Sequence, residues 1–107
     1  MITIEQFAEV QLRVATVLEA GPHPNADRLV VLKVDVGGGE TRQIVAGIRA
    51  HYEPSTLVGR QVVVVANLAP ATLRGVESQG MLLAASGDGK LTLLRPDAEM
   101  PAGSVVR

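Results

Sequence analysis

Two short apolar runs on either side of a polar loop limit what this chain can fold into. Val62–Ala66 and Met81–Ala85 each span five residues, and the first is almost entirely β-branched. Runs of this length and composition predict buried strands rather than helices. The loop between them carries an Arg, two hydroxyl and two amide side chains that a simple turn does not require. Because binding residues concentrate on loops held by a rigid scaffold, this loop is the first candidate for function.

The remaining elements follow from alternation and from glycine and proline positions. Leu29–Val36 alternates apolar and polar residues, which predicts a half-buried strand. Gly37–Gly39 predicts a hairpin turn rather than a phosphate-binding loop, because no Gly-Lys-Ser/Thr and no helix follows. Residues 21–25 predict an irregular loop, and Asp88-Gly89 predicts a second turn. Further strands are expected at 12–20, 41–46, 91–94 and 105–106, and short helical segments at 3–7, 49–52 and 54–57.

Five strands with a short helix between the third and fourth are the arrangement of the OB-fold. We therefore expect an all-β fold: a five-stranded barrel with an N-terminal turn of helix and C-terminal appendage strands. Thr3 and Gln6 have the capping-box spacing for that first turn, and uneven apolar spacing around Val17 indicates a bulge in the first strand. At 107 residues the chain is one domain, 1–107, with its core at 7–85 and an appendage at 86–107.

Composition excludes several classes of protein. The chain has no cysteine, which rules out disulfides and thiolate chemistry and fits a cytoplasmic protein. No apolar run could span a bilayer, and residues 1–7 do not resemble a signal peptide. The net charge of -1 gives no strong field for a polyanion, but residues 28–76 hold six basic and three acidic side chains. That local excess fits either an ordinary solvated surface or a phosphate-binding face.

The residue inventory gives little support for an enzyme. Ser78 lacks the glycine spacing of a nucleophile elbow, and no strand–elbow–helix unit is predicted around it. His23 lies between two prolines in the predicted loop, and we expect its side chain to be solvated rather than to act as a ligand. No His or carboxylate cluster has metal-ligand spacing, so we expect neither a metal nor a cofactor.

Folded RNA fits this sequence better as a ligand than single-stranded nucleic acid does. Phe7 and Tyr52 are the only aromatic residues, whereas single-strand binders on OB-folds stack bases on several rings. Folded RNA can be recognised through its shape, phosphates and 2′-hydroxyls by Arg, Ser, Asn and Gln side chains. Arg74 and Ser78 are the strongest candidates, since neither is needed to end a strand. Asn67 is equally well explained as a turn residue bonded to its own backbone.

Five segments carry a family pattern. They are Glu-x-x-Leu-Arg-Val at 9–14, His-Pro-Asn-Ala-Asp-Arg-Leu at 23–29, Arg-Gln-Ile-Val-Ala-Gly-Ile at 42–48, Val-Val-Ala-Asn-Leu at 64–68 and Leu-Arg-Gly-Val-Glu-Ser-Gln-Gly-Met at 73–81. Together they resemble the tRNA-binding domain family, and the last segment is the most specific. That family includes the C-terminal domain of bacterial methionyl-tRNA synthetases, free-standing dimeric tRNA-binding proteins and part of endothelial monocyte-activating polypeptide. The resemblance runs from Phe7 to about Ala85.

The resemblance implies a non-catalytic OB-fold module that binds the outer corner of tRNA by shape, with little base readout. It implies tRNA contacts at Asn67, Arg74, Ser78, Gln79 and Met81, with Lys33 and Arg42 as supporting phosphate contacts. It also implies a homodimer held by residues 2–7 and 91–106, and it leaves open whether an aminoacyl-tRNA synthetase is a partner. The apolar side chains of both segments fit a buried interface.

Two features leave alternatives open. Ala69 and Thr72 stand where relatives often carry basic residues, so we expect weaker binding or a shallower salt dependence. A related subgroup of dimeric OB-fold proteins resembles export chaperones that bind polypeptide, and this is the alternative function, although the intact segment 74–81 argues against it. Met1 with its short lead-in favours a free-standing protein, while a domain of a synthetase would read the same.

Overall fold

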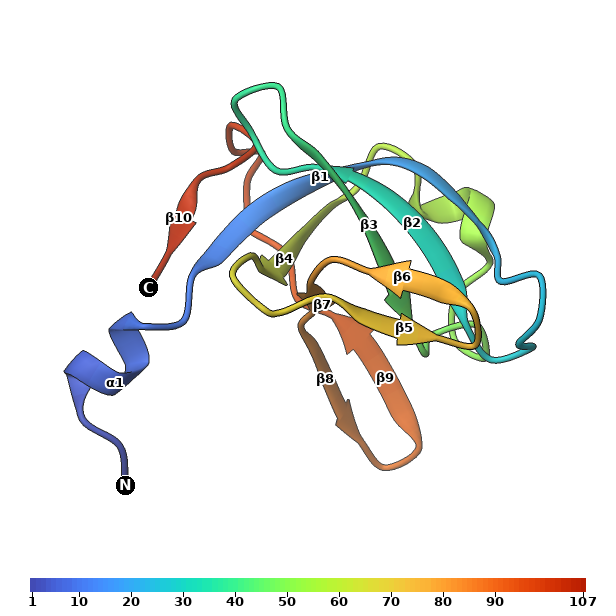
Figure 1. Ribbon diagram of the computed structural model, residues 1–107, viewed down its shortest axis with the longest axis horizontal. Coiled ribbons are helices and arrows are strands. Elements are labelled where there is room, and N and C mark those ends of the chain that lie inside the picture. The colour runs from blue at the N-terminus through green and yellow to red at the C-terminus, as the bar shows by residue number, and fades with distance from the viewer.

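Ten strands and two short helical segments make up the structure, a computed structural model that describes residues 1–107 (Figure 1). The main sheet contains β1 (Leu12–Pro22), β2 (Val30–Asp35), β3 (Thr41–Ala46), β4 (Gln61–Val65), β7 (Met81–Leu82) and β10 (Val105–Val106). Their order is β3-β2-β1-β4-β7, with β10 paired to β1. Two separate two-stranded sheets pair β5 (Ala71–Leu73) with β6 (Val76–Ser78), and β8 (Ala84–Gly87) with β9 (Lys90–Leu93).

The long strand β1 organises the barrel, because it pairs antiparallel with β2, β4 and β10. Its register against β2 shifts between Val17 and Glu19, which confirms the predicted bulge and lets one strand curve between two neighbours. Gly21 and Pro22 still pair with β2. The prediction that the irregular loop begins at residue 21 was therefore wrong by two residues.

The barrel closes where the chain after β6 runs beside β3. The Gln79 amide donates to the Gln43 carbonyl oxygen at 2.7 Å. A short 3-10 helix, η1 (Pro54–Leu57), lies between β3 and β4 and packs against β1, and its Leu57 is fully buried. The predicted all-β barrel, five-stranded with a short helix between its third and fourth strands, is confirmed. Residues 49–51 form the predicted single turn, in which the amides of His51 and Tyr52 donate to the Ile48 carbonyl oxygen at 2.9 and 3.0 Å.

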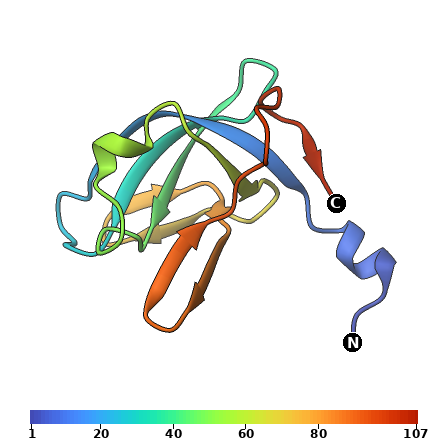
Figure 2. The same cartoon turned by 180° about the vertical axis from the view of Figure 1, so that it is seen from behind.

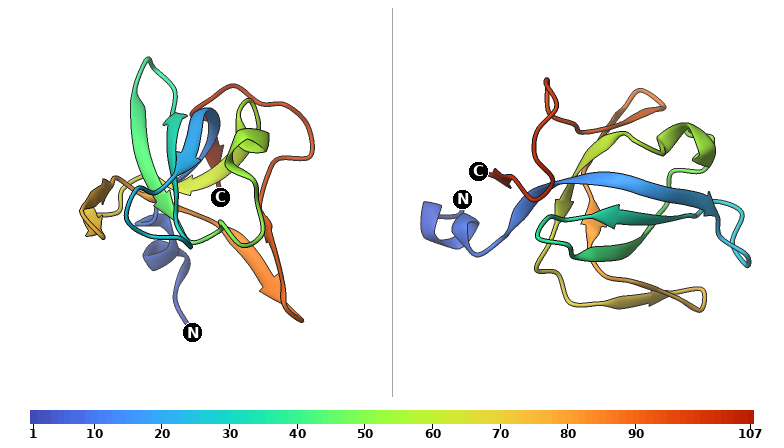
Figure 3. Two further views of the ribbon diagram at one scale, coloured as in Figure 1. Left: turned by 90° about the vertical axis from the view of Figure 1, so that its right-hand side faces the viewer. Right: turned by 90° about the horizontal axis from the view of Figure 1, so that it is seen from above.

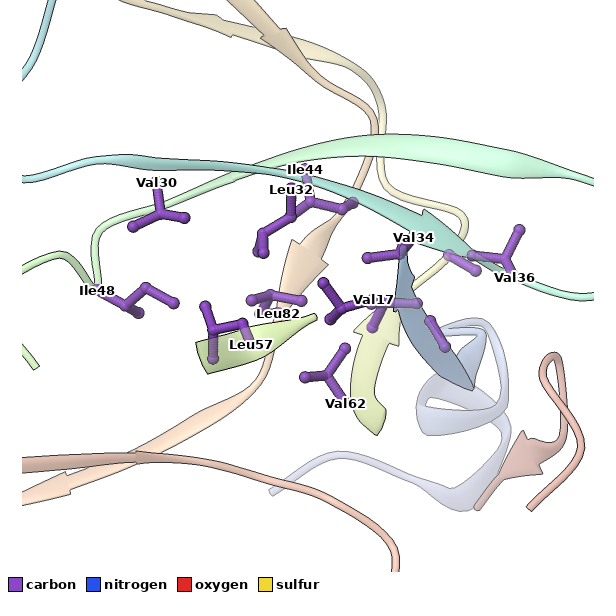
Figure 4. Packing of buried hydrophobic residues seen from close by; sticks show 13 residues of the cluster. Val17, Val30, Leu32, Val34, Val36, Ile44, Ile48, Leu57, Val62 and Leu82 are labelled. Atoms are coloured by element: carbon purple, nitrogen blue, oxygen red, sulfur yellow. The ribbon is translucent and has the colours of Figure 1, made fainter. Parts of the chain in front are cut away.

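The core fills the inside of the barrel with small β-branched and leucine side chains (Figure 4). Its cluster of 13 buried residues draws on the inward faces of β1, β2, β3 and β4 and on η1. In β2 the burial alternates as predicted: Val30, Leu32 and Val34 are buried, whereas Lys33 is exposed. This alternation leaves the outer faces of β2 and β3 free to carry polar side chains.

Two expectations about the second half of the chain were wrong. The polar loop 67–80 is folded as the β5–β6 hairpin rather than as an open loop. The run Met81–Ala85 is interrupted at Leu83, which separates β7 from β8. The chain leaves the main sheet there because β8 and β9 pair with each other, around the Asp88-Gly89 turn that the sequence predicted. The β8–β9 hairpin projects from the barrel (Figure 2).

The two ends of the chain lie at the same end of the molecule (Figures 1 and 2). Helix α1 (Ile4–Ala8) begins with the predicted capping box, Thr3 with Gln6, but buries none of its residues. Ahead of β10, Gly103 crosses the β2–β3 turn so closely that a Cβ on it would lie 2.7 Å from the Val36 carbonyl oxygen. None of the helices has the length and apolarity of a membrane span.

Candidate nucleic-acid interface

The β5–β6 hairpin with its turn, residues 71–78, is called the arm here and lies against β3 (Figure 1). Its base is fixed by Ser78, which is only 4% exposed. The Ser78 hydroxyl accepts from the Val45 amide at 2.9 Å and donates to the Gly80 carbonyl oxygen at 2.9 Å. Because the hydroxyl is buried with both partners inside the protein, we revise its expected role from tRNA contact to support of the arm.

Two glutamines extend this attachment along β3. The Gln43 amide donates to Gln79 Oε1 at 2.9 Å, and Gln43 Nε2 donates to the Glu77 carbonyl oxygen at 2.7 Å. Gln79 is half-buried, and both its backbone amide and its side-chain oxygen form hydrogen bonds with Gln43 of β3. Its Nε2 group is the part that remains available to a ligand.

The tip of the arm is fixed by His23, which the sequence had suggested would be solvated. That expectation was wrong: His23 is 5% exposed, and its Nε2 lies 2.9 Å from the Leu73 carbonyl oxygen. Its Nδ1 accepts from the Asn25 amide at 2.9 Å. The neighbouring Pro22 and Pro24 restrict the backbone on both sides of the ring. A histidine between two prolines, beside a conspicuous polar hairpin, is the one signal in the sequence that could have suggested this contact.

A groove runs along β1, β2 and β3 and reaches Gln79, next to the base of the arm. Its first section, of about 580 Å³, includes Lys33, Gln43 and Gln79 in its lining. A second section, of about 440 Å³, includes Arg42 and Asn67 and shares Gln79 with the first. The structure therefore brings together four of the residues expected to contact tRNA: Lys33, Arg42, Asn67 and Gln79.

These four side chains differ in how free they are to bind. Lys33 is exposed and forms no ion pair. Arg42 is held by Glu40, with 2.7 Å between Nε and Oε2, and by a further bond to the Ala66 carbonyl oxygen. The Asn67 side chain does not form the hydrogen bond to its own backbone that a turn residue would form. Its Oδ1 accepts from the Gln11 amide at 2.9 Å and its Nδ2 donates to the Glu9 carbonyl oxygen at 2.6 Å, so it anchors the N-terminal segment.

Arg74 and Met81 lie outside the groove. Arg74 is exposed at the tip of the arm, with no hydrogen bond or ion pair from its side chain, and its φ of 53° is in the left-handed region. Gly75 follows with a φ of 89°, so the arm ends in the two-residue turn typical of tight hairpins. Met81 is 47% exposed on β7 rather than part of the core. Arg74 is the only cation of the arm, and its side chain is exposed.

Arg13 was not among the expected site residues, although it lies in the first recognised segment. It lines a polar cavity of about 290 Å³ together with Gln11 and Arg42, and this cavity adjoins the second section of the groove at Arg42. Its guanidinium has no carboxylate partner and only a long contact, 3.5 Å, to the Gly103 carbonyl oxygen. An arginine at the start of an otherwise apolar strand was the available signal. No group of His, Cys, Asp or Glu side chains forms a metal-binding cluster.

Comparison with known proteins identifies the family. Residues 12–105 match the family model described as "Putative tRNA binding domain". The chain belongs to the tRNA-binding domain family. One relative is the methionine–tRNA ligase of Pyrococcus furiosus, which is 52% identical over 106 residues. Those residues are 99% of this chain but 14% of the ligase, so the chain spans only a small part of the length of such relatives.

Two solved structures share the whole of this tRNA-binding domain fold. A methionyl-tRNA-synthetase-related (MetRS-related) protein from Pyrococcus horikoshii superimposes with a TM-score of 0.92 and 37% identity, covering 100% of this chain and 98% of that one. The chaperone CsaA from Bacillus anthracis superimposes with a TM-score of 0.90 and 31% identity, covering 100% of this chain and 99% of that one. The same fold therefore occurs in proteins described as synthetase-related and in a protein described as a chaperone.

Proposed function

We propose that this chain is a non-catalytic, cytoplasmic module that binds folded tRNA by shape and backbone contacts, and that it acts as a homodimer. The observation that carries the proposal is the arm: an exposed arginine at the tip of a hairpin that is hydrogen-bonded to the barrel at both ends. A cation held in this way can meet a phosphate without a large loss of conformational freedom on binding. Membership of the tRNA-binding domain family supports tRNA as that polyanion.

The placement of the aromatic rings supports a folded ligand over a single strand. Tyr52 packs against the core, and Phe7 lines a cavity between the two ends of the chain, so neither ring reaches the groove. Without a stacking surface, affinity has to come from phosphate and ribose contacts. Arg74, Lys33 and the free amide group of Gln79 are the main contacts we propose. Arg42 and Asn67, which line the groove with Gln79, and Met81 on β7 are the others.

The charge of the groove predicts modest affinity. Glu19 lines the same section as Lys33, and Glu40 neutralises part of the charge of Arg42. Few unpaired cations are therefore left to displace counterions from the RNA. Such a module would act best where something else raises its local concentration, either dimerisation or attachment to a synthetase. The methionine–tRNA ligase relatives make an aminoacyl-tRNA synthetase the partner we propose.

A second copy of this chain is the occupant we propose for the apolar surface at the two termini. A cavity of about 430 Å³ there includes Ile4, Phe7, Val10 and Val106 in its lining. Ile4 is 74% exposed and Val105 61% exposed, which is unusual for large apolar side chains gathered at one end of a monomer. Ile4→Glu should give monomers without loss of folding, as measured by sedimentation. Glu5→Gln in the same helix is the matched control, and an unchanged dimer in Ile4→Glu would place the interface elsewhere.

The proposed function is tested by titrating tRNA across a salt series. Arg74→Asn removes the charge and keeps a residue that tolerates the left-handed turn. We expect it to cost about 1–2 kcal/mol of binding free energy and to lower the salt slope by about one unit. Lys90→Ala removes the same charge from the β8–β9 hairpin and should leave binding unchanged. Equal losses in the two variants would mean that only net charge matters.

One observation favours a second candidate function, the binding of extended polypeptide. Leu73 in the arm is 39% exposed, and Leu68 before the arm and Met81 after it are 46% and 47% exposed. Apolar side chains of this kind fit an unfolded chain better than RNA, and the fold is shared with a protein described as a chaperone. The unsubstituted protein should therefore be offered tRNA, a single-stranded oligonucleotide of equal length and an unfolded polypeptide. Saturable binding to tRNA, at least about tenfold tighter than to the single strand, supports the proposal. Binding to polypeptide alone would replace it.

A further inference from the structure

His23 links two segments that are 50 residues apart in the sequence. It follows directly after β1, and its Nε2 meets the Leu73 carbonyl oxygen near the end of β5. In an OB-fold the loops at these two places border the ligand-binding face. The first section of the groove described above has Gly21, two residues before His23, and Gln79, just after the arm, in its lining.

Within residues 71–76, only this contact joins the arm to the rest of the chain by a hydrogen bond. The other attachments, at Glu77, Ser78 and Gln79, all lie at the base of the arm. A two-stranded hairpin has little stability of its own. Without the bond to His23, the tip would therefore be fixed at one end only.

The imidazole has both of its nitrogens engaged. A neutral histidine has one donor and one acceptor. Since Nδ1 accepts from the Asn25 amide, the proton lies on Nε2, which donates to the Leu73 carbonyl oxygen. That carbonyl belongs to the same planar peptide group as the Arg74 amide. The bond therefore fixes the orientation of the peptide group that leads into Arg74. Arg74 is the first residue of the turn and has a φ of 53°.

We propose that His23 is a positioning residue for tRNA binding, which acts by holding the tip of the arm and so directing Arg74 at the ligand. The proposal rests on the proposed function, because it takes Arg74 as a phosphate contact. His23 itself, at 5% exposure, does not touch the RNA. It limits the range of positions that the Arg74 guanidinium samples before binding, so that less freedom is lost when the phosphate is engaged.

A double-mutant cycle between His23 and Arg74 tests this. His23→Leu fills the site with an apolar side chain and removes both hydrogen bonds. We expect it to weaken tRNA binding about three- to tenfold and to flatten the salt slope in the same direction as Arg74→Asn. In the Arg74→Asn background, His23→Leu should have no further effect. His23→Gln, which retains a donor and an acceptor, should recover most of the lost affinity, and His51→Leu, at the exposed histidine, should change nothing.

The same variants separate failure of this inference from failure of the proposed function. If His23→Leu weakens binding equally in both backgrounds, His23 does not act through Arg74 and the inference is overturned. If Arg74→Asn leaves tRNA affinity unchanged, the phosphate contact of the proposed function has failed. Amide hydrogen exchange of Leu73 and Val76, the pair that closes the β5–β6 hairpin, then still tests the tether: it should rise in His23→Leu and not in His51→Leu, and equal exchange in the two would overturn the inference. Should His23→Leu not fold, His23→Gln is measured in its place, with a smaller loss expected in the same cycle.

Discussion

The arm and the β8–β9 hairpin end in nearly the same turn but are attached to the barrel by different forces. In the arm, Arg74 and Gly75 have φ values of 53° and 89°; in the other hairpin, Asp88 and Gly89 have values of 52° and 74°. Both turns place a residue and a glycine in the left-handed region, which suits the twist of two antiparallel strands. The turn alone therefore does not determine what a hairpin can do.

The attachments explain the difference. The arm is joined to the barrel by polar contacts: Ser78 and Gln79 at its base and His23 at its tip. The β8–β9 hairpin is joined mainly through Leu91 and Leu93, which pack against the core, while β8 is exposed along its whole length. The two hairpins lie on different sides of the molecule (Figure 3). Hydrogen bonds fix direction, whereas apolar contacts mainly fix proximity. The arm is thus the hairpin that can hold a side chain in a fixed direction.

The largest expected effect comes from the glycine where the arm returns to the main sheet. Gly80 has a φ of 148°, and a Cβ there would lie 2.9 Å from the Val65 carbonyl oxygen and 3.0 Å from Ile44 Cδ1. Gly80→Ala should destabilise the fold by about 3 kcal/mol, because it combines backbone strain with a clash against main chain. Gly87→Ala in β8 is the matched control, since a Cβ there meets nothing within 4 Å. Equal losses in urea denaturation would contradict this account of the arm.

The second prediction compares a serine in each hairpin. Ser78→Ala leaves the buried Val45 amide without its acceptor, so we expect a loss of about 1–3 kcal/mol in the free energy of unfolding. Ser86→Ala lies on the exposed strand β8 and should change stability by less than about 0.5 kcal/mol. Thermal melts of both variants measure the difference. If Ser78→Ala weakened tRNA binding and kept the melting temperature, the hydroxyl would be a ligand contact after all.

Much of the fold could be predicted because it is encoded in short local patterns. The alternation in Leu29–Val36, the β-branched run at Val62 and the Asp88-Gly89 turn each correspond to an observed element. The arm was missed because its strands are only three residues each and carry polar, small and apolar side chains without alternation. Such a hairpin is stabilised by bonds to distant residues, and a local pattern contains no information about those bonds.

In the candidate site, too, the sequence could predict what local patterns encode but not what long-range contacts decide. The sequence could point to Arg74, because an arginine next to a glycine in a loop has no structural reason to be there. It could not distinguish Ser78 from Arg74, since burial is decided by the partner strand, and the hydroxyl turned out to face Val45. His23 and Asn67 were misinterpreted for a related reason: each bonds to backbone about 50 residues or more away. Long-range polar contacts are therefore what the structure adds to the sequence.

The smallest expected effect concerns Tyr52, whose hydroxyl forms hydrogen bonds with the β8–β9 hairpin. The Tyr52 hydroxyl accepts from the Leu93 amide at 2.9 Å, and 3.4 Å separates it from Thr92 Oγ1. Tyr52→Phe should cost about 1 kcal/mol near neutral pH and raise hydrogen exchange at the Leu93 amide, while exchange in the arm stays unchanged. The hydrogen bond with Thr92, followed by that with Leu93, lowers the pKa of Tyr52 below its usual value of 10.0.

Because the pKa of Tyr52 is lowered, the stability that its hydroxyl contributes depends on pH, and the direction of that dependence can be predicted. A phenol whose pKa is lower in the folded state than in the unfolded state stabilises the fold only where it ionises, so this contribution is absent at neutral pH and grows as the pH rises toward 10 and above. The stability difference between the unsubstituted protein and Tyr52→Phe should therefore widen in alkaline solution. Denaturation curves of both proteins at neutral and alkaline pH would measure it. A constant difference would mean that folding does not favour ionisation of the Tyr52 hydroxyl, and a difference near zero at both pH values would mean that the ring holds the hairpin by packing alone.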